Sequence, residues 1–128
     1  MTPEIYGILF SWAVFLSPYS AETPPVMMQV PHEFFVEEVC GGKECNVLGW
    51  YDGHKIYIQE KLSGRLLDEM IVHEMVHYLQ DLSMNYENKS CKDSIIRERE
   101  AYFVQGEYAI QATGNLPRHV NSHVSCKK

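Results

Sequence analysis

Basic residues are scarce in this sequence, and they do not cluster. Lys and Arg together number 11 against 17 Asp and Glu, which gives a formal net charge of −6, and Lys127-Lys128 is only a short tail. Nucleic acids and anionic membrane surfaces attract proteins mainly through clustered Lys and Arg side chains. We therefore expect neither of them as a partner.

Long apolar runs are also missing. The main one, residues 5–16 (IYGILFSWAVFL), is too short to span a bilayer comfortably, and the small and helix-breaking residues of SPYSAETPP follow it. Because this order is typical of a secretion signal, we expect residues 1–21 to be a signal peptide and residues 22–128 to be one domain, secreted or periplasmic, with no stable membrane insertion after leader cleavage. The opening MTPE has no basic residue, so the alternatives are a start further upstream or a core element of the mature fold.

The cysteines are few: Cys40, Cys45, Cys91 and Cys126. No second close pair accompanies the C-x4-C spacing of the first two, which argues against a zinc ribbon. An even number in a small exported chain favours two disulfides, for which three connectivities are possible. Cys40 and Cys45 bracket the turn-prone GGKE and can pair locally, and Cys91 and Cys126 would then tie the C-terminal tail to the last helix. Four reduced thiols in a cytosolic protein are the alternative.

Three segments in the first half of the chain have strand-like patterns. They are residues 30–39 (VPHEFFVEEV), residues 46–51 and residues 55–59 (KIYIQ). The last two are separated by Asp52-Gly53-His54, and Asp-Gly is a strong hairpin signal because both positions tolerate a positive φ. These segments predict a small antiparallel three-stranded sheet.

The second half of the chain has helical periodicity. Apolar residues recur at helical spacing over residues 64–82, with Ser63 as a possible N-cap. A second helix should start near Asp93 or Ser94 and end at Gly114, which suits the position after a helix. Strands followed by two long helices predict an α+β fold, with the sheet packed on the helices.

The helix over residues 64–82 contains HEMVH, with His73, Glu74 and His77. Two histidines four residues apart point from the same face of a helix, where their imidazole nitrogens can converge on one Zn²⁺ ion. Glu74 then lies beside the metal, where it can take a proton from a zinc-bound water. Buried imidazoles without a partner are costly, and the dense apolar flanks argue against a fully exposed helix. We therefore favour a zinc site over two surface histidines.

A site with two histidines needs a third protein ligand. Glu98 and Glu100 in the second helix both qualify chemically. Glu98 shares its face with small and amphipathic residues suited to lining a site, whereas Glu100 shares its face with charged and solvated ones. We favour Glu98, although the alternation of sign in residues 97–100 is also typical of an exposed helix.

The two motifs together, HEMVH and the helix with Glu98-Arg99-Glu100-Ala101-Tyr102, resemble the gluzincin metallopeptidases. More narrowly, they are similar to small secreted minigluzincin-like proteins in which a β-hairpin precedes HExxH. The resemblance covers about residues 47–108 and implies a zincin-like fold. It implies His73, His77 and Glu98 as zinc ligands and Glu74 as general base. It also places residues 55–59 beside the zinc helix with an open backbone edge, although we favour an ordinary core strand there.

Tyr102 departs from the family pattern, in which several members have an Asp that orients the first zinc histidine. A phenol can accept a hydrogen bond from His73, can donate one to an oxyanion in the transition state, or can simply pack. We assign Tyr102 to catalysis, with plain packing as the alternative. Gln80 and Gln105 could orient the site, but we favour plain polar surface for both.

The remaining signals are weaker. His119 and His123 lie four apart near the C-terminus without a Glu partner, and His32 and His54 have no visible partners. The tripeptide at residues 88–90 matches an N-glycosylation acceptor.

The sequence predicts a zinc-dependent hydrolase, a peptidase that acts on peptide or protein substrates. The first alternative is a non-catalytic secreted zinc-binding domain that acts through protein contacts. The second alternative is a disulfide-stapled domain whose histidines bind nothing.

Overall fold

The computed structural model describes residues 1–83 and 90–116 of the chain. Its fold is α+β, as the sequence predicted. The elements in chain order are α1 (Pro3–Leu16), β1 (Val26–Val30), α2 (His32–Glu38), β2 (Gly49–Tyr51), β3 (Lys55–Gln59), α3 (Gly64–Ser83), α4 (Cys91–Tyr108) and the π-helical turn η1 (Ala109–Thr113).

The sheet is mixed, whereas the sequence analysis predicted an antiparallel one. Its strand order is β1-β3-β2, with β1 parallel to β3 and β2 antiparallel to it. The predicted strand over residues 30–39 is wrong: β1 ends at Val30, and Pro31 is the N-cap of helix α2. Since a proline fixes φ and is well tolerated at the start of a helix, it ends the strand and begins the helix. The connection from β1 to β3 runs through α2 and β2 and supplies the crossover that a parallel pair of strands requires.

The β2–β3 hairpin forms as predicted, with a φ of 99° at Gly53. The central strand β3 is paired on both sides, so its backbone offers no open edge. Ile56 and Ile58 are fully buried toward α3, as the core-strand interpretation predicted. Among the described strands, β1 and β2 are the edges of the sheet.

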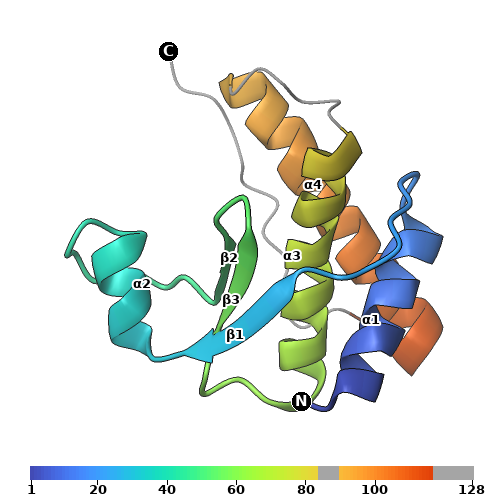
Figure 1. Cartoon of the computed structure of the whole chain (residues 1–128), viewed down its shortest axis with the longest axis horizontal. Coiled ribbons are helices and arrows are strands. Elements are labelled where there is room, and N and C mark those ends of the chain that lie inside the picture. Colours follow the sequence, from blue (N-terminus) through green and yellow to red (C-terminus); the bar gives the residue numbers. More distant parts are fainter. Residues whose placement is uncertain (84–89, 117–128) are drawn as a thin grey trace.

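Helix α3 lies between the sheet and the helices α1 and α4 (Figure 1). It begins at Gly64, as predicted, and ends at Ser83. Helix α4 begins two to three residues earlier than predicted, with Ser90 as its N-cap, and continues through η1 to Gly114, which has a positive φ as expected for a residue that ends a helix.

Helix α1 contributes to the hydrophobic core. Leu9, Phe10 and Ala13 are buried and belong to the same cluster as the apolar residues of α3 and α4. In this structure these residues of the predicted leader therefore pack as a structural element. The cleavage of residues 1–21 stays a prediction.

A disulfide joins Cys40 to Cys45, with Cα atoms 6.4 Å apart, as the local pairing predicted. Cys126, the predicted partner of Cys91, lies outside the described part of the chain. His119, His123 and two residues of the glycosylation motif also lie outside it. Within the described residues, no helix combines the length and apolar character needed to cross a membrane.

Candidate metal centre

Helix α3 presents His73 and His77 on one face, one turn apart, as the spacing predicted. Their rings lie edge to face with centroids 5.1 Å apart. The side chain of His73 is 4% exposed and that of His77 is 14% exposed, so the pair lies between the core and the surface. Imidazoles at this depth require polar partners.

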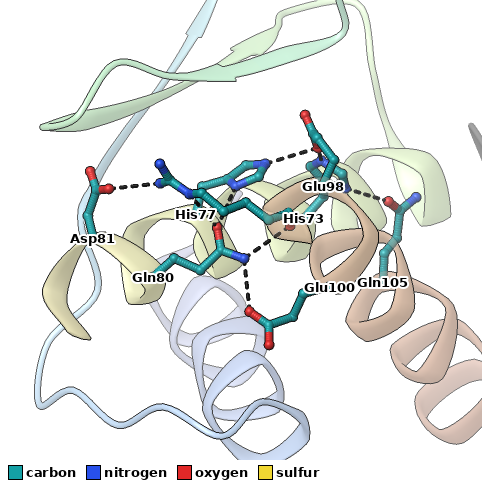
Figure 2. A network of polar contacts seen from close by, with 8 residues as sticks. His73, His77, Gln80, Asp81, Glu98, Glu100 and Gln105 are labelled. Carbon is teal, nitrogen blue, oxygen red and sulfur yellow. Dashed lines mark hydrogen bonds and ion pairs between the residues drawn. The ribbon is translucent and has the colours of Figure 1, made fainter. Parts of the chain in front are cut away.

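Glu98 of α4 is the partner that both imidazoles share (Figure 2). Its Oε1 atom lies 2.9 Å from Nε2 of His73 and 3.1 Å from Nε2 of His77. Atoms bound to one tetrahedral zinc ion lie about 3.3 Å apart, which is close to the two distances from Glu98. The three residues form a group that could hold a metal ion, with all ligand atoms within 4.8 Å of one another.

The other nitrogen of each imidazole faces the carbonyl oxygen of a glutamine side chain. Nδ1 of His73 lies 3.0 Å from Oε1 of Gln105, and Nδ1 of His77 lies 2.9 Å from Oε1 of Gln80 (Figure 2). Because a carbonyl oxygen only accepts hydrogen bonds, each Nδ1 carries a proton. A bound metal ion would then take the place of the Nε2 proton that faces Glu98. This is the arrangement that a metal-binding histidine requires.

Gln80 and Gln105 are both fully buried, so the surface role that we favoured for them is wrong. The spacing of each glutamine along its helix could have indicated that it lies beside the site. Gln80 follows His77 by three residues and Gln105 follows Glu98 by seven, so each shares a helix face with a ligand. Hydrophobic periodicity does not reveal such residues, because it assigns every polar residue, including a buried glutamine, to the surface of the helix.

Glu74 lies under strand β2 and is 5% exposed. A Cβ atom at Gly49 would lie 3.2 Å from Oε2 of Glu74 and 3.0 Å from Cδ1 of Ile58. Any residue other than glycine at this position would therefore require these side chains to shift by a few tenths of an ångström. Burial raises the pKa of Glu74, although the nearby imidazoles of His73 and His77 act in the opposite direction. A raised pKa suits a group that must take up and release a proton.

A pocket of about 260 Å³ opens beside these residues. It is lined by Gly49, Trp50, Tyr51, Glu74, His77, Ser94, Arg97 and Glu98. Burial and the neighbouring Asp81 raise the pKa of Tyr51 to about 12, so its hydroxyl remains a hydrogen-bond donor at neutral pH. The pocket thus brings a buried carboxylate, two members of the candidate metal group and donor groups to one opening.

The ionisation of Glu98 and that of His77 are coupled. Burial alone would raise the pKa of Glu98, but the hydrogen bonds with His73 and His77 prevail and hold it well below its usual range. Burial alone would lower the pKa of His77, but the hydrogen bond with Glu98 and the charge of Glu74 prevail and raise it. Glu98 is consequently ionised at neutral pH, which is the form that binds a metal.

The other predicted residues fall in different places. The ring of Tyr102 packs against that of His73, with centroids 4.4 Å apart, and its catalytic role stays a prediction. Glu100 was expected to be solvated, but it accepts hydrogen bonds from Gln80 and from the hydroxyl of Tyr19. His32 was expected to lack partners, but it interacts with Glu44 and Gln59, away from the metal group.

Comparison with protein-family models, with curated proteins and with solved structures gives no significant match to this chain. The functional argument therefore depends on the chemistry and geometry of the site.

Proposed function

We propose that this protein is a zinc-dependent hydrolase of gluzincin-like type, and that it cleaves peptide bonds. The observation that carries the proposal is the convergence of His73 Nε2, His77 Nε2 and Glu98 Oε1 beside the buried carboxylate of Glu74, at the mouth of a pocket. Two imidazoles favour zinc over magnesium or calcium, which prefer oxygen ligands.

A zinc ion bound there would act as a Lewis acid, polarising a substrate carbonyl and lowering the pKa of a water molecule to about 7. Glu74 would accept a proton from the attacking water and pass it to the leaving amine. Its burial supports this role, because a carboxylate with a raised pKa holds a proton more readily between the two steps. Tyr102, in contact with His73, would donate a hydrogen bond to the developing oxyanion.

The backbone of β2 supports a peptide substrate. The ladder bonds from Gln59 N–H to the carbonyl of Leu48 and from Asp52 N–H to the carbonyl of Lys55 belong to alternate positions of the hairpin. Since antiparallel pairs alternate, the N–H and C=O groups of Gly49 and Tyr51 point away from β3. Both residues line the pocket, so an extended peptide could pair with this edge beside Glu74.

The edge strand beside the pocket is thus β2, whereas the sequence analysis considered residues 55–59 for this role. The disulfide between Cys40 and Cys45 is consistent with the oxidising environment of an exported protein, and we propose a secreted or periplasmic location.

The experiment measures zinc content and peptide cleavage for the full chain and three variants. Wild type should bind about one zinc per chain, and Glu98→Ala should lose it because only the two histidines remain. Glu107→Ala is the matched control, since Glu107 lies on the same helix and bonds to Gln111, outside the site. Glu74→Gln should retain zinc but lower the cleavage rate by at least about a hundredfold.

Cleavage is measured by mass spectrometry on a mixture of unstructured peptides. Wild-type protein that binds no zinc would refute the metal site and the hydrolase together. Stoichiometric zinc with no cleavage of any peptide would instead favour the non-catalytic zinc-binding domain.

A further inference from the structure

A row of hydrogen bonds leads from His77 away from the metal group toward the N-terminal segment. Its first member is Gln80, whose amide makes four hydrogen bonds (Figure 2). Oε1 faces Nδ1 of His77 at 2.9 Å and accepts from Nε of Arg97 at 3.1 Å. Nε2 donates to the carbonyl of Arg97 at 3.0 Å and to Oε1 of Glu100 at 2.9 Å.

These four bonds allow one orientation of the Gln80 amide. If the amide were flipped, its NH₂ group would face the N–H of Arg97, and its oxygen would face the carboxylate of Glu100 and a carbonyl. Gln80 is fully buried, so water cannot replace the lost partners. The orientation of Gln80 therefore dictates that Nδ1 of His77 carries the proton.

Glu100 extends the row to the segment that follows α1. The same Oε1 atom that accepts from Gln80 also accepts from the hydroxyl of Tyr19. Tyr19 is held in place by its own chain, because α1 packs into the core through Leu9, Phe10 and Ala13. The N-terminal segment thereby reaches the metal group through three consecutive side chains: Tyr19, Glu100 and Gln80.

We propose that Tyr19, Glu100 and Gln80 are positioning residues that hold His77 in its metal-binding orientation, so that the N-terminal segment controls the affinity of the site for zinc. The inference rests on the proposed function only in taking zinc as the ion. It predicts that a residue of the N-terminal segment, distant from the metal in sequence, changes metal binding. It also gives residues 1–21 a role at the site for as long as they remain attached.

The experiment compares two substitutions that each remove one phenol hydroxyl from the N-terminal segment. Tyr19→Phe breaks the row at its outer end. Tyr6→Phe is the matched control, because the Tyr6 hydroxyl donates to the carbonyl of Pro25 at 2.6 Å, away from the row. Zinc affinity of the full chain is measured by competition with a chelating dye, with a melting curve for each variant as the check on folding.

Tyr19→Phe should weaken zinc binding about threefold to tenfold, and Gln80→Leu about tenfold to a hundredfold, as for other residues that orient metal ligands. Tyr6→Phe should leave the affinity unchanged. An NMR signal from the Nδ1–H proton of His77 in the zinc-loaded protein should be visible in wild type and Tyr6→Phe, and lost to solvent exchange in Gln80→Leu.

Equal zinc affinities for Tyr19→Phe, Tyr6→Phe and wild type would overturn the positioning role while leaving the zinc site intact. Equal losses in the two tyrosine variants would also overturn it, because a general loosening of the N-terminal segment would explain them. A wild-type chain that binds no zinc would refute this inference together with the proposed function.

Discussion

At the scale of single residues, the pairing of His77 with Glu98 makes stability depend on pH in a specific way. The pKa of Glu98 is lowered from 4.5, so its contribution to the free energy of unfolding is present above that value and is lost as the pH falls through the lowered pKa. The pKa of His77 is raised from 6.5, so its contribution is complete below that value and is lost as the pH rises through the raised pKa. The pair therefore stabilises the chain most between these two values.

This prediction is checked by urea unfolding at a series of pH values in the presence of a chelator. The difference in free energy of unfolding between wild type and Glu98→Gln should be largest in that window and smaller on either side. A difference that stays constant from acid to alkaline pH would show that the two side chains do not form an ion pair.

The sequence pointed to the three residues that meet in the candidate metal group, because two of them have a spacing typical of metal-binding histidines. His73, Glu74 and His77 lie on one helix. Glu98 was preferred to Glu100 because small and amphipathic residues share its helix face. The glutamines whose side chains contact the two histidines could not be predicted in the same way. Gln80 and Gln105 are polar residues on helices, and only the packing of α3 against α4 turns them inward.

At the scale of elements, the prediction concerns α1. Leu9 is buried in the core cluster, whereas Phe15 on the same helix is 74% exposed. Leu9→Ala should lower the free energy of unfolding by about 2–5 kcal/mol, because it removes apolar contacts and leaves a cavity. Phe15→Ala should change it by no more than about 0.5 kcal/mol.

The measurement is urea unfolding of the full chain. Equal and small effects of the two substitutions would contradict the place of α1 in the core. They would favour a leader that is only loosely attached to the domain.

The elements that could be predicted from the sequence have strong local signals. The periodicity of α3 and the Asp52-Gly53 turn of the hairpin specify their structures without help from the rest of the chain. The segment at residues 30–39 has no such unambiguous signal. Its apolar residues fit both a strand and a short helix, and Pro31 favours the helix. Strand β1 was not predicted because it forms by pairing with β3, which is distant along the chain, and not from a local signal.

At the scale of the whole molecule, the metal group joins α3 to α4, so a bound ion would link the two longest helices. Zinc that binds the folded chain and not the unfolded one should therefore raise the free energy of unfolding, by about 2.7 kcal/mol at a free concentration one hundred times its dissociation constant. The effect should disappear in Glu98→Ala and persist in Glu107→Ala. It is measured from urea unfolding in buffered zinc, and equal stabilisation of all three proteins would place the binding elsewhere.

The two glutamines beside the histidines have one more consequence, which concerns electric charge. A divalent cation held by two neutral imidazoles and one carboxylate keeps one net positive charge within that set of ligands. One Asp or Glu at position 80 or 105 would cancel this charge, and carboxylates at both positions would make the set net negative. Either carboxylate would make the imidazole that it contacts a stronger base. The uncharged amides of Gln80 and Gln105 orient the same rings without neutralising the ion. Such a site would bind the metal less tightly than one with carboxylates at these positions. The metal would in return attract an electron-rich oxygen of a substrate more strongly.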